Sequence, residues 1–333
     1  MTELPMHMNV VAPRAPGGPE MFETIRRPIP VPARGEVLVK VRSAGVNRAD
    51  CLQRQGQYPV PAGATDIIGL ECSGEVVALG EEVSRWKPGD AVCALLVGGG
   101  YAEYVAVPEA QCLPCPAGMG WDDAASLMEA MCTVWSNVRL RGGLGEGQTL
   151  LVHGGSSGIG VTALQIFAAF GHRIWTTAGS DEKCAACLEI GATRAINYRR
   201  EVFENVVLAE TGGRGVDVVL DMVGGDYLGR NLKALADDGR LVGIAASGGR
   251  VASVDLLELY RRRQTLTGSG LRRQPLAEKA RIVASVEENL WPLLASGRIK
   301  PLVYRSFPWV EAGAAHALME SSAHIGKIVL RVA

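Results

Sequence analysis

The sequence predicts an α/β protein in which a mainly β domain is interrupted by a doubly wound parallel sheet. Strand-like stretches separated by proline and glycine fill roughly the first 125 residues. From about residue 146, short apolar stretches alternate with helical ones, as in a parallel sheet with helical crossovers. The last ~35 residues are too few to fold alone and are expected to complete the first domain. We therefore expect one domain over residues 1–125 and 298–333, and the other over residues 126–297.

Composition limits the class of protein. The 333 residues include 34 basic and 35 acidic groups, which give a net charge of −1, and 47% are hydrophobic. The near-neutral charge argues against a nucleic acid or an acidic membrane as a partner recognised by charge. No apolar run reaches the ~18–20 residues of a membrane span. The first residues lack the pattern of a signal peptide, so we expect a cytoplasmic protein.

In the first domain, two stretches alternate apolar and polar residues with period two, Glu36–Arg42 and Glu75–Ala78. Each is predicted to be a strand with one buried face. Frequent prolines and glycines, including the run Gly98–Gly100, mark irregular loops between the strands.

In the second domain, a buried strand over Thr149–His153 precedes the glycine-rich loop Gly154–Gly160. Apolar residues at helical spacing follow from Ile159 to Phe170, and Gly171 is expected to end that helix.

The remaining elements continue this alternation. Asp181 is expected to N-cap a helix that ends at Gly191. Further strands are predicted over Arg173–Thr177, Val216–Leu220 and Arg240–Ile244. Helices are predicted over Leu228–Ala236 and Leu276–Leu294, and the tail is predicted to form a strand, a helix and a strand over Leu302–Arg305, Val310–Glu320 and Gly326–Arg331.

The glycine-rich loop is the first candidate for a ligand site. It lies between a predicted strand and a predicted helix, where glycines allow a tight turn and backbone N–H groups at the helix N-terminus can meet a pyrophosphate. Aligned with the pattern G-x-G-x-x-G, the loop has Gly155 and Gly160 at the outer positions, Ser157 at the second glycine position, and Gly158 between them. The context favours a dinucleotide site, and an ordinary strand-to-helix turn is the alternative.

Cofactor choice is expected to depend on the residue about 20 positions beyond this loop. An enzyme specific for NAD would place Asp or Glu there, but this chain has Thr177–Ser180, with Lys183 one helical turn later. No acidic group would repel a 2′-phosphate, Ser180 can donate a hydrogen bond to it and Lys183 can neutralise it. The pattern favours NADPH, and a solvated surface lysine is the alternative.

Eight cysteines include two Cys-x-x-Cys pairs, Cys112/Cys115 and Cys184/Cys187, which imitate a four-cysteine zinc site. The gap between the pairs far exceeds the roughly 15–20 residues of a zinc ribbon, and the second pair falls inside a predicted helix. We expect free thiols and no metal site.

Further motifs extend along nearly the whole chain: Gly17–Glu20, Asn47–Tyr58, Gly69–Gly74, Gly89–Asp90, Gly98–Tyr104, Asn197–Tyr198 and Gly326–Leu330. With the glycine-rich loop, they resemble the zinc-less quinone oxidoreductases of the medium-chain dehydrogenase/reductase superfamily. Asn47–Tyr58 and Ser157 resemble most the branch that includes the tumour-suppressor-inducible NADPH quinone oxidoreductase. The resemblance implies a GroES-like β domain with a Rossmann insertion that binds NADPH.

The positions that bind metal in zinc-dependent relatives differ in this chain. The catalytic cysteine position resembles Asn47, and the Gly-His-Glu motif becomes Gly-Leu-Glu at residues 69–71. Leu70 cannot bind a metal, and the four-cysteine structural lobe has no counterpart between residues 90 and 112. Without a metal ion to stabilise an alkoxide, the resemblance implies reduction of an electrophile that accepts hydride directly.

Carried over residue by residue, the resemblance also implies a site. Asn47, Asp50 and Tyr58 match residues that flank the nicotinamide and the quinone, and Tyr58 is implied to contact or protonate the quinone. A turn-bracing Asn47, a helix-capping Asp50 and an interior tyrosine bonded to backbone are the alternatives, as is a surface position for His324. The implied cofactor contacts are Thr133, Gly155, Ser157, Gly158, Gly160, Ser180, Lys183, Tyr198, Gly224, Gly225, Ser269, Leu271 and His324.

The expected function is NADPH-dependent reduction of a quinone or a quinone-like enone by a homodimer or homotetramer. The alternative is a 2-alkenal or enoyl-thioester reductase, for which Arg261–Arg263 and Arg272-Arg273 would form a basic entrance. An RNA-binding role would use the same arginines, but the neutral charge and the lack of interleaved aromatic residues argue against it.

Overall fold

The computed structural model describes residues 4–332, which form two compact units. Unit 2 comprises Met131–Leu271 and Ser296–Lys300, and unit 1 comprises the other described residues. The expected domain boundaries differ from these units mainly at helix α9 (Leu276–Ala295), which is grouped with unit 1. The indole of Trp291 on this helix donates a hydrogen bond to the Pro114 carbonyl at 2.9 Å, and this bond attaches the helix to unit 1.

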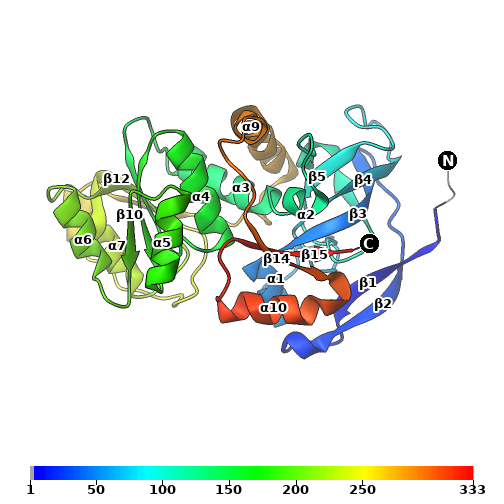
Figure 1. Cartoon of the computed structure of the whole chain (residues 1–333), viewed down its shortest axis with the longest axis horizontal. Coiled ribbons are helices and arrows are strands. Elements are labelled where there is room, and N and C mark those ends of the chain that lie inside the picture. Colours follow the sequence, from blue (N-terminus) through cyan, green and yellow to red (C-terminus); the bar gives the residue numbers. More distant parts are fainter. Residues whose placement is uncertain (1–3, 333) are drawn as a thin grey trace. The chain divides into compact units, whose positions relative to one another are not determined.

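A seven-stranded sheet forms the centre of unit 1 (Figure 1). Its strands run in the order β14-β15-β3-β4-β5-β7, and β6 also pairs with β3. β14 and β15 are parallel, the other pairs are antiparallel, and β1 and β2 form a separate antiparallel pair. The bounds are β1 His7–Pro13, β2 Phe22–Pro28, β3 Glu36–Val46, β4 Glu71–Leu79, β5 Ala91–Leu95, β6 Tyr104–Pro108, β7 Cys112–Pro114, β14 Val303–Pro308 and β15 Lys327–Arg331.

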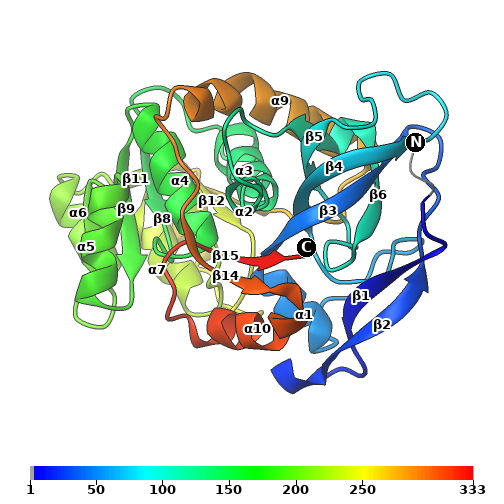
Figure 2. The same cartoon turned by 45° about the vertical axis from the view of Figure 1, so that its right-hand side comes forward.

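Because β15 pairs with β3, the C-terminal tail is part of the sheet of unit 1. Helix α10 packs against α1, and both are visible in Figure 2. An ion pair between the buried Arg54 and the partly exposed Glu320 joins these two helices. The helices of this unit are α1 Arg48–Arg54, α2 Trp121–Ala124, α9 and α10 Ala312–Ser321, with 3-10 turns η1 Pro19–Met21, η2 Glu109–Gln111 and η4 Trp309–Glu311.

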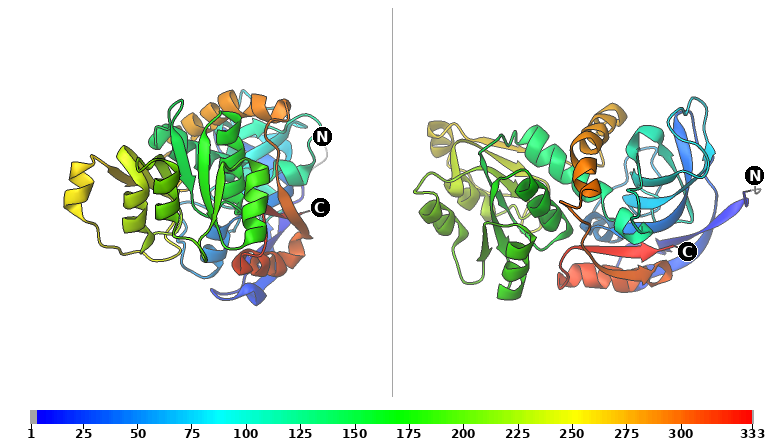
Figure 3. Two further views of the ribbon diagram at one scale, coloured as in Figure 1. Left: turned by 60° about the vertical axis from the view of Figure 1, so that its left-hand side comes forward. Right: turned by 45° about the horizontal axis from the view of Figure 1, so that its top comes forward.

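A six-stranded parallel sheet forms unit 2, and Figure 3 shows its strands between flanking helices. The order β10-β9-β8-β11-β12-β13 is that of a doubly wound dinucleotide-binding sheet, so the predicted α/β class is confirmed. Its strands are β8 Thr149–Val152, β9 Arg173–Ala178, β10 Arg194–Asn197, β11 Val216–Asp221, β12 Leu235–Gly243 and β13 Thr265–Gly268. Its helices are α4 Gly158–Ala169, α5 Asp181–Ile190, α6 Phe203–Glu210, α7 Tyr227–Ala234 and α8 Leu256–Arg261, and helix α3 (Met128–Val134) leads into it.

Three details of the predicted elements are corrected by the structure. Ser180, rather than Asp181, is the N-cap of α5, because Ser180 is extended and its Oγ accepts a hydrogen bond from the Lys183 N–H at 3.2 Å. The strand predicted from Arg240 begins at Leu235. The helix predicted from Val310 begins as a 3-10 turn and becomes α-helical at Ala312.

No helix in the described part of the chain is both long and apolar enough to cross a membrane. All eight cysteines are free thiols, as expected.

Candidate functional site

The glycine-rich loop connects β8 to α4. Ser157 caps the helix, because its Oγ accepts a hydrogen bond from the Gly160 N–H at 3.0 Å, and Gly158 begins the helix. A Cβ atom on Gly155 would overlap the Thr176 hydroxyl, and one on Gly160 would overlap the backbone at Gly154. Side chains are therefore excluded at these two positions, and the backbone of the turn forms a cradle at a helix N-terminus of the kind that binds a pyrophosphate.

The end of β9 has the small and basic residues expected for a 2′-phosphate. The Oγ of Ser180 accepts the capping hydrogen bond, so its hydroxyl proton remains available to donate. Lys183 is half-buried, and burial lowers its pKa, as does the nearby charge of Arg199. A Cβ atom on Gly179 would lie 2.7 Å from the Tyr198 hydroxyl, so Tyr198 closes over this strand end. Ser180, Lys183 and Tyr198 are thus brought together.

Arg199 was missed by the sequence analysis. It is exposed directly after Tyr198 and lies close enough to Lys183 to influence its charge. Its neighbour Arg200 is instead held by Asp181 at 2.5 Å. In the sequence, Arg199 could have been found as part of the basic pair Arg199-Arg200, which follows the third strand of this sheet along the chain.

Helix α3 continues into a π-helix, Trp135–Arg141, which the sequence did not predict. Within it, the buried Asn137 side chain donates to the Thr133 carbonyl at 2.8 Å and accepts a hydrogen bond from the Ser269 hydroxyl at 2.8 Å. The structure therefore brings together Thr133 and Ser269, and the buried Leu271 follows closely in the chain. Single turns of π-helix occur frequently at functional sites.

Gly224 and Gly225 follow β11 with φ angles of +66° and +52°. The Asp221 carboxylate accepts a hydrogen bond from the Gly224 N–H at 3.2 Å. A Cβ atom on either glycine would lie 2.8 Å from a carbonyl oxygen of Gly248 or Gly249. The loop after β11 packs closely on the loop that contains Gly248 and Gly249. This packing is sufficient to require glycine at positions 224 and 225 without a ligand.

Unit 1 contains a cluster of charged groups that we call the buried charge cluster. Its members are Asp50, Glu71, Glu129, Arg272, Lys279 and Lys327.

Asn47 and Asp50 begin helix α1 at this cluster. The Asn47 N–H donates to Asp50 Oδ2 at 2.7 Å, as in a capping box. The Asn47 side chain donates to Glu71 Oε1 at 3.0 Å and accepts from Lys327 Nζ at 2.7 Å. Both structural alternatives raised by the sequence, a bracing Asn47 and a capping Asp50, are therefore present. Asp50 Oδ1 remains buried without a hydrogen-bond partner among the described residues.

The residues at the metal positions do not fit a zinc ion. Lys327 Nζ lies 2.5 Å from Glu71 Oε1, and both side chains are buried. Asn47 is already bonded through both of its side-chain polar atoms, and Leu70 is buried and apolar. Within residues 4–332, no group of three or more His, Cys, Asp or Glu side chains is arranged to hold a metal. The chemistry of this donor set supports the expected absence of zinc, which stays a prediction.

Tyr58 lies half-buried beside Arg272. The guanidinium carbon is 5.2 Å from the centre of the Tyr58 ring, and the Arg272 Nε donates to the Val97 carbonyl at 2.7 Å. The Tyr58 hydroxyl makes no hydrogen bond with the described residues, so the alternative of a tyrosine bonded to backbone does not hold. Burial raises the pKa of Tyr58, which is therefore a neutral donor at physiological pH.

Two carboxyl groups of the buried charge cluster have raised pKa values. Burial raises the pKa of Asp50 to about 7, and the pKa of Glu129 to about 8, with Glu71 adding to both shifts. Neither Glu129 nor Lys279 belongs to a motif, so the sequence analysis missed them. A single acidic residue within the apolar stretch from Leu127 to Val134 was the available signal for Glu129.

His324 lies in unit 1 directly before β15. It is buried, with its ring centre 6.5 Å from that of Tyr304. The alternative of a surface histidine therefore does not hold, and its contact with a cofactor stays a prediction.

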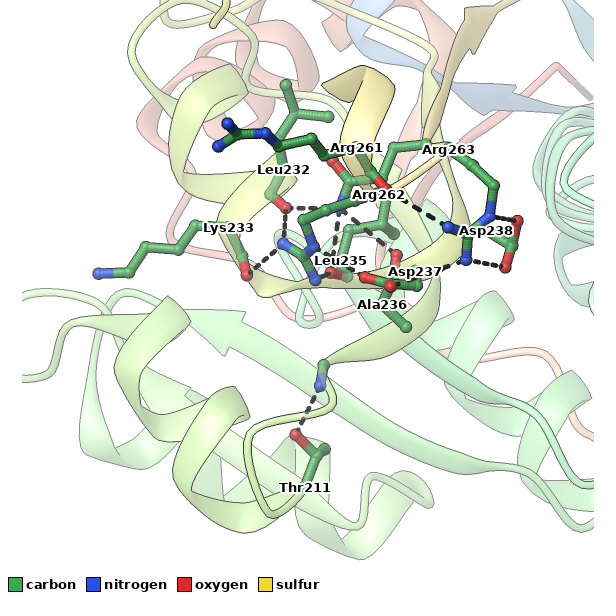
Figure 4. Close-up of polar contacts among 12 residues, drawn as sticks. Thr211, Leu232, Lys233, Leu235, Ala236, Asp237, Asp238, Arg261, Arg262 and Arg263 are labelled. Atoms are coloured by element: carbon green, nitrogen blue, oxygen red, sulfur yellow. Dashed lines mark hydrogen bonds and ion pairs between the residues drawn. The ribbon is translucent and has the colours of Figure 1, made fainter. Parts of the chain in front are cut away.

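Three of the arginines suggested for a basic entrance, Arg261, Arg262 and Arg263, have other partners. Figure 4 shows Arg262 among the carbonyl groups that end α7, where it donates to Leu232 O at 3.0 Å. Arg263 forms an ion pair with Asp238 at 2.8 Å, and Arg261 pairs with Glu258 at 3.1 Å. These side chains are engaged in holding α8 and β12, which weakens the thioester and RNA alternatives that depended on them.

Known families match both parts of the chain. Residues 33–117 match the family described as alcohol dehydrogenase GroES-like domain, and residues 190–330 match that described as zinc-binding dehydrogenase. A quinone oxidoreductase of Pseudomonas aeruginosa is 33% identical over 322 residues, which cover 94% of this chain and 96% of the relative. A phenolphthiocerol/phthiocerol polyketide synthase protein of Mycobacterium tuberculosis is 30% identical over 314 residues, which cover 90% of this chain and 14% of that longer one.

Solved structures agree with these matches. A quinone oxidoreductase of Pseudomonas syringae superposes with a TM-score of 0.87 at 29% identity, covering 98% of this chain and 100% of that one. A mycobacterial protein solved in complex with NADPH superposes with a TM-score of 0.86 at 28% identity, covering 97% of this chain and 99% of the other.

Proposed function

Because this chain belongs to the medium-chain dehydrogenase/reductase superfamily and has quinone oxidoreductases among its relatives, we propose that it is a cytoplasmic, NADPH-dependent quinone oxidoreductase. The single observation that carries the proposal is the set of residues at the metal positions, Asn47, Leu70 and the Lys327-paired Glu71. With no Lewis acid to activate an alcohol, a fitting substrate already carries a polarised acceptor for hydride.

The cofactor contacts follow from unit 2. The loop with Gly155, Ser157, Gly158 and Gly160 would hold the pyrophosphate by its backbone N–H groups. The 2′-phosphate would be held by Ser180, Lys183, Tyr198 and the additional Arg199. The nicotinamide and its ribose would be held by Thr133, Gly224, Gly225, Ser269 and Leu271, with His324 as a further contact. When bound, NADPH supplies the hydride, and the protein supplies binding and orientation.

The substrate would be held in unit 1 beside Tyr58. Its unpartnered hydroxyl can donate a hydrogen bond to a carbonyl oxygen, and the Arg272 guanidinium adds positive charge beside it. Both groups would stabilise the negative charge that appears on a quinone oxygen during reduction. Asn47 and Asp50 would act by fixing the start of α1.

A 2-alkenal or enoyl-thioester reductase remains the second candidate. The observation in its favour is the similarity to part of a polyketide synthase. Such an enzyme also places hydride on a polarised acceptor, so the same cofactor site would serve it.

The proposed assembly is a homodimer. β13 is an edge strand of the parallel sheet, and no described strand pairs with its outer side. Unit 2 also exposes apolar side chains on this strand and on α8, namely Leu256, Leu257, Tyr260 and Leu266. A second copy of this chain is the partner that would cover them.

A steady-state assay of NADPH oxidation tests the proposal, with ortho- and para-quinones, 2-alkenals and enoyl thioesters as acceptors. We expect kcat/KM to be highest for quinones and NADPH. A preference for alkenals or thioesters would favour the second candidate, and no oxidation with any acceptor would refute both.

A further inference from the structure

Glu129 differs from the other acidic residues of the buried charge cluster because no described residue bonds to its carboxyl group. Its backbone N–H donates to Glu71 Oε2 at 3.0 Å, which fixes the start of α3. Its side chain is half-buried and so retains access to solvent. Glu71, in contrast, is fully buried and bonded to Lys327 and Asn47.

Charged and titratable groups from several elements interact electrostatically with Glu129. They are Asp50 on α1, Tyr58 in the loop after α1, Glu71 on β4, Arg272 in the loop before α9, Lys279 on α9 and Lys327 on β15. Burial, together with the charges of Glu71 and Asp50, raises the pKa of Glu129 to about 8, against the opposing charges of Lys327 and Arg272. The carboxyl group is therefore mostly protonated at neutral pH and can act as an acid.

An independent observation indicates a ligand at the same place. Arg272 is only 3% exposed, and neither Nη1 nor Nη2 has a hydrogen-bond partner among the described residues. Its guanidinium group covers the Tyr58 ring, and its charge acts on both Asp50 and Glu129. Two buried guanidinium nitrogens without an acceptor are unfavourable, so a bound molecule with an acceptor oxygen would stabilise them.

We propose that Glu129 is the proton donor of the reaction, and that it delivers its carboxyl proton to the substrate oxygen held beside Tyr58 and Arg272. This inference rests on the proposed function and adds a catalytic residue to it. Tyr58 then orients the oxygen, and Arg272 stabilises its negative charge until the proton arrives.

The atoms and electrons balance as follows. The hydride from NADPH brings two electrons to the substrate and leaves negative charge on its oxygen. The O–H bond of Glu129 breaks and an O–H bond forms on the substrate, which leaves a carboxylate that regains a proton from water. One quinone, one NADPH and one proton give one hydroquinone and one NADP⁺.

The test compares wild-type protein with Glu129→Gln, which keeps the shape and loses the proton. We expect kcat at pH 7 to fall about 100-fold, with the Kd for NADPH, measured by fluorescence, unchanged. The wild-type kcat should be constant below pH 7 and decrease as pH rises through about 8, whereas the variant should lose this decrease. Glu129→Asp should recover part of the activity together with the pH dependence. Asp123→Asn, which removes a nearby acid outside the cluster, is the matched control and should behave as wild type.

An infrared titration of the protein without cofactor distinguishes a failure of the inference about Glu129 from a failure of the proposed function. The difference between wild type and Glu129→Gln should contain the carbonyl band of a protonated carboxyl at pH 7, and this band should disappear as pH rises through about 8. An ionised Glu129 at pH 7, or a Glu129→Gln variant with the wild-type kcat and pH profile, would overturn the inference. Wild-type protein that shows the band but reduces no quinone would overturn the proposed function and, with it, the role of Glu129 as its proton donor.

Discussion

At the residue scale, the charges at the end of β9 are proposed to determine which cofactor binds. Lys183 and Arg199 supply positive charge where the ribose of the cofactor is expected, and Asp181 is bound to Arg200 and Asn197. A 2′-phosphate carries close to two negative charges, so each contact with it is charge-assisted.

We expect Lys183→Ala to reduce kcat/KM for NADPH about 10- to 100-fold and to leave NADH kinetics nearly unchanged, because one charge-assisted contact contributes roughly 1.5–3 kcal/mol. Steady-state kinetics with both cofactors measure this, and higher ionic strength should act in the same direction. Arg200→Ala is the control, because Asp181 already binds that guanidinium. Equal losses with NADPH and NADH would show that Lys183 is an ordinary surface lysine.

Tyr58→Phe should lower kcat with quinones about fivefold and leave the Kd for NADPH unchanged, because a single neutral hydrogen bond contributes about 1 kcal/mol and the hydroxyl is proposed to face the substrate. Turnover at saturating NADPH and fluorescence titration provide the two readouts. Tyr260→Phe, at an exposed position on α8, serves as the control. A collapse of NADPH affinity with normal turnover would contradict this placement of Tyr58.

At the element scale, one buried ion pair joins β4, β15 and the start of α1. Lys327 binds Glu71 and Asn47, so the C-terminal strand is attached to the segments that carry Asp50 and Tyr58. The resemblance aligns Asn47 and Glu71 with the metal-site motifs of zinc-dependent relatives, and we expect the contribution of this pair to be structural.

Lys327→Met should destabilise the protein by about 3–5 kcal/mol, because it leaves Glu71 buried without its cation. Urea unfolding measures the loss, and Lys87→Met, at an exposed position, should have almost no effect. The double variant Glu71→Gln/Lys327→Met should recover part of the stability. Wild-type stability of the single variant would mean that the pair does not hold these elements together.

Leu266→Glu should convert the proposed homodimer to a monomer, because it places a charge on the exposed edge strand β13. Light scattering coupled to gel filtration gives the mass directly. Leu188→Glu, exposed on α5, is the control and should remain dimeric. A monomeric wild-type protein would refute the proposed assembly.

Period-two and helical patterns were sufficient to predict most strands and helices, because each has one face in a core. They could not predict the π-helix Trp135–Arg141, because its wider turn does not follow the α-helical spacing of apolar residues. They also missed β13, because this strand is largely exposed on the sheet edge. The glycine-rich loop was predictable as a strand-to-helix turn because steric exclusion at Gly155 and Gly160 is local. The buried charge cluster was not, because its members are brought together only by the tertiary fold.

At the scale of the whole molecule, the two units carry different parts of the proposed site. Unit 2 contains the doubly wound sheet with the glycine-rich loop. Unit 1 contains the buried charge cluster, whose residues do not fit a zinc ion. Under the proposed function, this division would let a member of a superfamily with zinc-dependent relatives act on substrates that need only hydride and a proton.

Purified protein should contain no stoichiometric zinc, because Leu70 and the engaged Asn47 cannot act as ligands. Elemental analysis measures the metal content, and activity should persist after treatment with a chelator. About one zinc per chain, or activity lost on chelation and restored by zinc, would contradict the structural reasoning at this site.

The most direct test of the central claim is a single-turnover experiment in which protein loaded with NADPH is mixed rapidly with a para-quinone. The account predicts that the absorbance of NADPH decays in one enzyme-dependent phase, and that one hydroquinone forms for each NADPH consumed. Absence of this decay with quinones, together with rapid decay when an alkenal or enoyl thioester is mixed in, would contradict it.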